Sequence, residues 1–75
     1  MKWCFTNANL VGINLSNSKL FYTNLSGANL TNADLTNANM DGTNFDYANL
    51  TNAKINEKRM GNTNSKGAIG LSWSR

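Results

Sequence analysis

The chain has 75 residues, a formal net charge of +3, and no histidine or proline, which together allow one small domain with a core of marginal size. Without histidine, serine or cysteine catalysis would need another base. Carboxylate pairs, metal-ligand clusters and phosphate-binding glycine loops at recognisable spacing are missing too, so we expect neither an enzyme nor a cofactor or metal site.

The cysteine count and the apolar segments indicate the cellular compartment. Cys4 is the only cysteine, so no intrachain disulfide can form and an oxidising compartment is not indicated. Residues 1–10 lack the apolar stretch of a signal peptide, and no apolar run approaches membrane-spanning length. We therefore expect a soluble, cytoplasmic protein without membrane contact.

A five-residue repeat organises the chain. Every fifth residue carries a large apolar side chain, and we call this the central position: Phe5, Leu10, Leu15, Leu20, Leu25, Leu30, Leu35, Met40, Phe45, Leu50, Ile55 and Met60. The residue two before it is usually small, and the residue one before it is mostly Asn. Because a period of five fits neither a helix nor a flat strand, the chain must turn a corner once per unit, with the small and large residues inside.

These three correlated positions resemble the pentapeptide-repeat family, whose unit reads roughly Ala-(Asp/Asn)-Leu-x-x, over residues 8 to about 60. The resemblance implies an all-β fold, a right-handed quadrilateral parallel β-helix with four units per coil and about three coils. We expect residues 1–60 to form this solenoid, and residues 61–75 to form a degenerate last coil and a C-terminal cap or tail.

The first units depart from the repeat. Trp3 occupies a small-residue position, where another coil beneath it would have no room, so we expect its indole to cover the exposed core as a lid. Cys4 falls in an outward position and is expected to be a surface thiol. Ile13 replaces a small residue and should take more of the interior volume.

Aromatic residues follow the central position in two places. Phe21 and Tyr22 occupy the two outward positions after Leu20, and Phe21 in particular is expected to be exposed. Tyr47 is expected to add to this pair from the far corner of the neighbouring side, one coil higher. We predict a partner-binding surface at Phe21, Tyr22 and Tyr47; the alternative is scattered surface residues without a contact role.

Asparagine should form regular columns on the outside of the coils. Stacking by 20 residues places Asn9 with Asn29 and Asn49, and Asn24 with Asn44. We expect their amides to hydrogen-bond up the stack as structural ladders.

Beyond Ala53 the repeat decays. Lys58 falls in an inward position, so the coil should open near it, and Ser65 and Gly70 replace the large apolar residue. We expect a cap over this end from four apolar residues, with a disordered tail as the alternative: Ala68, Ile69, Leu71 and Trp73. Five basic residues also gather here, although without interleaved aromatics they do not favour nucleic-acid binding: Lys54, Lys58, Arg59, Lys66 and Arg75.

The expected function is a non-catalytic scaffold that binds another protein through its rigid sides, with the partner unknown. The resemblance implies one alternative, because some pentapeptide-repeat proteins mimic duplex DNA and bind DNA gyrase. Those proteins are long and strongly acidic, whereas this chain is short and basic. A second alternative is a structural module that stacks with copies of itself through its open ends.

Overall fold

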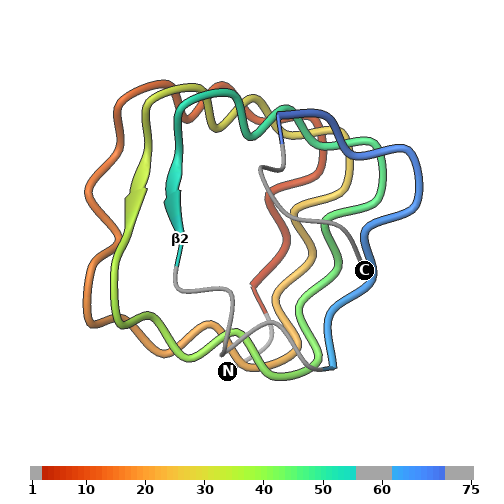
Figure 1. Cartoon of the computed structure of the whole chain (residues 1–75). Coiled ribbons are helices and arrows are strands. Elements are labelled where there is room, and N and C mark those ends of the chain that lie inside the picture. Colours follow the sequence, from red (N-terminus) through yellow and green to blue (C-terminus); the bar gives the residue numbers. More distant parts are fainter. Residues whose placement is uncertain (1–2, 56–61, 71–75) are drawn as a thin grey trace.

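The structure, a computed structural model, describes residues 3–55 and 62–70, and the predicted fold class is confirmed. The chain winds as a right-handed coil with four short sides per turn, and successive coils lie on one another from residue 3 toward residue 70 (Figure 1). Lys58, Leu71 and Trp73, and with them the expected opening and part of the expected cap, lie outside the described residues.

Parallel hydrogen bonding joins each coil to the next. Strand β1 (Asp34–Leu35) pairs in parallel with β2 (Lys54–Ile55), and eight isolated parallel bridges join further residues that are also twenty positions apart. Within each bridge the bonds are short; for example, the Leu30 N–H donates to the Asn49 carbonyl at 2.7 Å. Regular strands stay short because a corner interrupts every unit.

The interior is filled by the central and small-residue positions. Eleven apolar side chains form the buried core: Leu20, Leu25, Ala28, Leu30, Ala33, Leu35, Ala38, Met40, Phe45, Ala48 and Leu50. Thr23, Thr43 and Thr63 are buried in one small-residue column, and the Thr43 hydroxyl donates to the Leu20 carbonyl at 2.6 Å. Every buried side-chain polar atom of the described residues has a hydrogen-bond partner, as a buried polar group requires.

Each corner is a tight turn with one residue in the left-handed region. In eleven turns the central carbonyl accepts from the N–H three residues later, at 2.9–3.2 Å. The second residue after the central one has a positive φ in all eleven, as a type II turn requires. Asparagine holds this position five times, glycine four times, and tyrosine twice, at Tyr22 and Tyr47.

The outward asparagines cap these turns. The Asn24 Oδ1 accepts from the Ser26 N–H at 3.0 Å, and the Asn44 Oδ1 accepts from the Asp46 N–H at 2.8 Å. The same bond recurs on another side between Asn49 and Thr51, at 3.1 Å. The amide oxygens therefore do not form the expected ladders up the stack. Each of these Oδ1 atoms instead accepts from the backbone N–H two residues later, because that N–H is already in place nearby.

The N-terminal end of the solenoid is only partly covered. Trp3 stacks on Phe5 with ring centroids 6.1 Å apart, yet it stays 50% exposed. An apolar cavity of about 200 Å³ remains at this end, lined mainly by Trp3, Phe5, Leu15 and Leu20. The indole thus forms one wall of the opening instead of the expected lid. Ile13 packs against the core, as expected.

At the other end, residues 62–70 continue the coil. Asn64 bridges to Asn44, and Ile69 bridges to Asn49. Ile69 takes the outward position of its unit and is 56% exposed, so the prediction that it covers the end of the core is wrong. Ala68 is partly buried against the core.

Leu35→Ala should destabilise the fold by about 2–5 kcal/mol, because it opens a cavity in a fully buried column. Leu15→Ala is the matched control: it lies below Leu35 but only partly buried, so its cost should be clearly smaller. Urea unfolding of both variants measures the difference. Equal losses would contradict the described difference in packing.

Asp34 performs at one turn the capping that asparagine performs elsewhere. Its Oδ1 accepts from the Thr36 N–H at 3.0 Å and from the Thr36 hydroxyl. These hydrogen bonds, the hydroxyl bond first and the backbone bond second, lower the pKa of the Asp34 carboxyl below its ordinary value of 3.8, with a smaller effect of Lys54. Because the folded pKa is the lower one, the stabilisation is present above the ordinary value and is lost as the pH falls through the folded pKa.

Asp34→Asn should keep the turn capped and remove this pH dependence, because Asn14 caps the equivalent turn one coil below. At neutral pH the two proteins should have similar stability. As the pH falls below about 4, wild type should lose stability faster than the variant. Thermal unfolding across pH 2.5–7 checks this, since every other carboxyl group is shared. Parallel stability curves would show that the charge of Asp34 contributes nothing.

Candidate interaction surface

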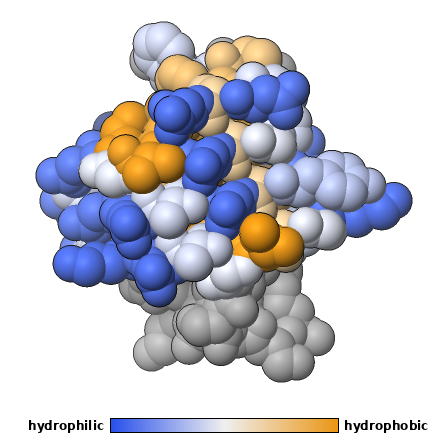
Figure 2. Space-filling model, turned by 90° about the horizontal axis from the view of Figure 1, so that it is seen from above, coloured by the Kyte–Doolittle hydropathy of each residue, from blue (hydrophilic) through white to orange (hydrophobic). Residues whose placement is uncertain are grey.

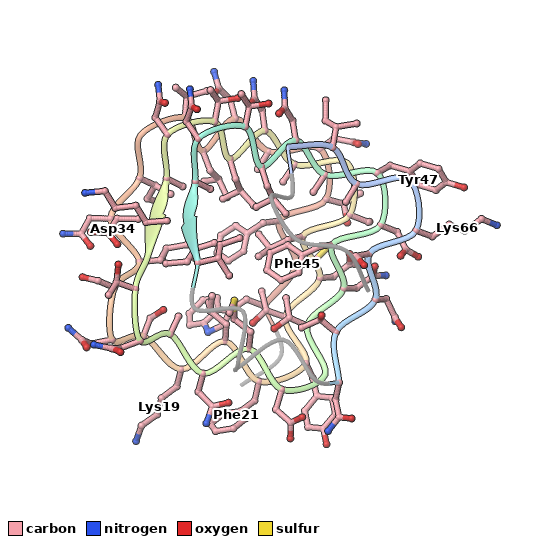
Figure 3. The ribbon with its side chains drawn as sticks, in the orientation of Figure 1. Lys19, Phe21, Asp34, Phe45, Tyr47 and Lys66 are labelled. Carbon is pink, nitrogen blue, oxygen red and sulfur yellow. The ribbon has the colours of Figure 1, made fainter. Side chains whose placement is uncertain are left out.

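One side of the solenoid carries a tyrosine at each of its two corners. We call it the tyrosine side; it consists of residues 3–7, 22–27, 42–47 and 62–67, with Asn24, Asn44 and Asn64 in a column along its middle. Tyr22 stands where the side begins in one coil, and Tyr47 stands where it ends in the next. They are 61% and 62% exposed. Figure 3 shows Tyr47 pointing away from the solenoid at one corner and Phe21, the neighbour of Tyr22, at the other.

Both tyrosines have strained backbones. Tyr22 has φ 57° and Tyr47 has φ 62°, whereas the nine other corners that the structure describes have asparagine or glycine. The left-handed conformation costs a residue with a Cβ about 1–2 kcal/mol, and asparagine lowers that cost with its short polar side chain. A bulky aromatic residue has no such compensation and is an outlier there. Strain of this kind persists at functional sites more often than elsewhere.

A glycine lies beside each tyrosine ring in the next coil. A Cβ placed on Gly42 would come within 2.4 Å of the Tyr22 ring, and one on Gly67 within 2.5 Å of the Tyr47 ring. Each tyrosine is thus paired with the glycine twenty residues later. The rings lie against bare backbone, which holds them at the corner although most of their surface is exposed.

Phe21 was expected to be exposed, and this expectation is wrong. It is half-buried, whereas Tyr22 beside it is exposed. The Tyr22 N–H donates to the Asp41 carbonyl at 3.0 Å, so Asp41 follows Phe21 in the same corner of the next coil. Phe21 and Tyr22 therefore share one corner, and Tyr47 occupies the opposite corner of the same side.

Acidic groups accompany the tyrosines. The Asn62 Nδ2 donates to the Asp41 carboxylate at 2.7 Å, and the Lys66 N–H donates to the Asp46 carboxylate at 2.9 Å. A shallow hollow of about 550 Å³ lies at the upper part of this side, next to Tyr47; it is lined by Asp46, Thr63, Asn64, Ser65 and Lys66. The side therefore combines two exposed phenols with fixed polar groups and a depression.

The adjacent side offers less. Figure 2 looks onto the side built from residues 8–12, 28–32, 48–52 and 68–70, which is largely hydrophilic with separate apolar spots. Val11 and Ile69 are the exposed large apolar residues on it, at 50% and 56% exposure. Single exposed apolar residues of this kind are ordinary on a soluble surface.

No arrangement for catalysis is found among the described residues. Cys4 is exposed, and its Sγ lies 3.4 Å from the Thr6 hydroxyl, whose hydrogen bond lowers the pKa of the thiol. Residues 3–55 and 62–70 contain no group of three potential metal ligands among His, Cys, Asp and Glu. The same residues contain no helix that is long and apolar enough to cross a membrane.

Gly42→Ala should destabilise the protein by about 1 kcal/mol more than Gly12→Ala. Both glycines have positive φ, so both variants carry the left-handed cost, but only Gly42 faces a ring, whereas Gly12 has open space around it. Adding Tyr22→Asn to Gly42→Ala should remove the excess. Chemical unfolding of the double-mutant cycle measures this coupling, and additive effects would contradict the pairing.

Comparison with known proteins finds repeat proteins of one family. The family described as pentapeptide repeats (8 copies) matches residues 5–37 and 23–57. A pentapeptide repeat protein from the cyanobacterium Cyanothece 51142 is 35% identical, with TM-score 0.73, over 95% of this chain and 50% of that one. One from the Arabidopsis thaliana thylakoid lumen is 35% identical, with TM-score 0.69, over 91% of this chain and 44% of that one.

The chain spans about half the length of these solved structures. A search among curated proteins finds no match. The matched repeats extend over more than half of the sequence and agree with the observed coils, turns and columns. The chain therefore belongs to the pentapeptide repeat family.

Proposed function

We propose that this chain is a non-catalytic scaffold that binds another protein through the tyrosine side. The observation that carries the proposal is the left-handed backbone of Tyr22 and Tyr47. Neither tyrosine is needed to close its turn, since asparagine or glycine does so at the other described corners. The fold accepts about 1–2 kcal/mol of strain at each position to present a phenol there.

The exposed groups on this side suit a protein partner. Tyrosine is enriched in protein interfaces because its ring adds apolar contact area while its hydroxyl forms hydrogen bonds. Between the two corners, the Asn24 and Asn44 amides have their oxygens engaged in turn caps, which leaves their N–H groups for acceptors on a partner. The hollow beside Tyr47 gives space for a protruding side chain.

Charge on this side supports a protein over a nucleic acid. Although the whole chain has a net charge of +3, the described charged residues of this side are Asp46 and Lys66, and Asp41 directly precedes its first corner. Two carboxylates and one ammonium provide no excess positive charge for a phosphate backbone. A partner with basic and hydrogen-bonding groups matches this surface better.

Replacing both tyrosines, as Tyr22→Asn with Tyr47→Asn, should abolish partner binding without loss of stability. Asparagine closes the same turn at other corners, so the variant should unfold at the wild-type temperature or above it. Affinity capture from the lysate of the native host identifies the partner. Titration calorimetry with the purified partner should then show binding weakened at least about tenfold, as for the loss of an anchor residue.

The matched control is Asn32→Gly with Asn52→Gly, which changes the same turn position on another side. This control should bind the partner as wild type does. The proposal is wrong if the tyrosine variant binds equally well, or if wild type retains only copies of itself. A drop in thermal stability of the tyrosine variant would assign the rings a packing role instead.

A further inference from the structure

We propose that two copies of this chain pair through the N-terminal end of the solenoid, with the Cys4 side of one copy antiparallel to the Cys4 side of the other. This end is formed by the first coil, residues 3–22, which lies at one extreme of the stack in Figure 1. The contact uses the edge of the coil and its open core. Cys4 lies on the lower edge of the tyrosine side, whereas the Tyr22 ring lies against Gly42 in the coil above, away from this contact.

The backbone of the first coil is prepared for such a contact. In the second coil, the Asn24 N–H donates to the Trp3 carbonyl and its carbonyl accepts from the Phe5 N–H, so both groups point toward the first coil. By the same geometry, one residue per side of the first coil points both groups away from the stack: Cys4, Asn9, Asn14 and Lys19. No described residue bonds to these groups.

A second copy, related to the first by a two-fold axis across the stack, supplies hydrogen-bond partners for these backbone N–H and carbonyl groups. In an antiparallel pair, two opposite residues exchange both N–H···O bonds, which is the pattern that a residue with both groups on one edge can form. Every side of the overturned copy runs antiparallel to the side that it meets. The edge is thus complementary to itself, as an isologous contact requires.

The rings at this end favour one register. With Cys4 opposite Cys4 of the second copy, each Trp3 comes to lie beside Phe5 of the other copy. The Trp3–Phe5 stack of each copy has its ring centroids 6.1 Å apart. Together the two stacks form one aromatic cluster that closes the cavity of about 200 Å³ at the N-terminal end of each copy. The register that instead centres the axis on the Lys19 sides would place two ammonium groups opposite each other, which is unfavourable.

Another coil of the same kind does not fit beneath the first one. Trp3 occupies the position that Thr23, Thr43 and Thr63 hold in the coils above it, and those threonines are buried between coils. An indole there needs a neighbour that leaves room for a ring. The overturned copy provides that room, because its own end has the same cavity.

The available area sets the expected affinity. The molecule measures 24 × 24 × 22 Å along its principal axes, so its end offers on the order of 500 Å² per copy. Together the two ends approach the lower limit of about 1,000 Å² for a specific interface. We therefore expect a reversible dimer with a dissociation constant on the order of micromolar.

Sedimentation equilibrium of the whole chain tests the association. The mass should rise with concentration from 8.2 kDa toward twice that value and then stop. Trp3→Ser should weaken dimerisation at least about tenfold, because it removes half of the ring cluster. Tyr22→Asn, on the outward surface, should leave it unchanged. A monomer at every concentration, or a mass that continues past the dimer, overturns the proposal.

Crosslinking of Cys4 tests the register. A short bismaleimide should join wild-type chains into a covalent dimer at concentrations where sedimentation shows dimers. The control moves the thiol to an equally exposed corner, as Cys4→Ser with Thr36→Cys, and should remain largely uncrosslinked. Equal crosslinking of both proteins would indicate random collision and overturn the register. Because the Tyr22 and Tyr47 rings lie against Gly42 and Gly67 of the coils above, away from this edge, failure here would leave the proposed partner binding standing.

Discussion

The turn at the end of every unit is the constraint on which the rest of the structure depends. In each of the eleven described turns the central carbonyl accepts a hydrogen bond from the N–H three residues later, and this turn requires a left-handed residue at the second corner position. Only three residues remain extended between corners. Hence each side is short, the coil closes after four units, and residues twenty apart stack in columns.

Stacking converts local regularity into stability. Each coil alone would have an open core and unpaired backbone groups, but neighbouring coils supply both apolar cover and hydrogen-bond partners. In eight units the outward Asn or Asp caps the turn that follows it, as Asp34 does for Thr36. Such a repeat thus supplies a core residue, backbone hydrogen bonds to the next coil and a turn cap. The corner residues can therefore vary without changing the coil.

Much of this could be predicted from the sequence because the repeat is nearly unbroken from Ala28 to Asn52. The period assigned the central residues to the core and the polar ones to the surface. It did not reveal how far a corner side chain stands out, so Phe21 was expected to be exposed and is half-buried. The prediction of amide ladders was wrong for a related reason. Periodicity places side chains in columns, but it does not indicate which nearby N–H an Oδ1 atom will accept from. The pairs Tyr22–Gly42 and Tyr47–Gly67 were visible at a spacing of twenty, yet their meaning depends on the backbone conformation.

The same pairs restrict how a chain of this kind can grow. Solenoids lengthen by tandem duplication of whole coils, and here a duplicated coil containing Tyr22 would set one tyrosine ring against the backbone of another tyrosine. A copy of residues 23–42 is free of that conflict, because both of its corners on the tyrosine side are glycine, Gly27 and Gly42. Duplication of a coil that carries either tyrosine would therefore place a ring against a residue with a Cβ, whereas duplication of residues 23–42 would keep every ring beside a glycine.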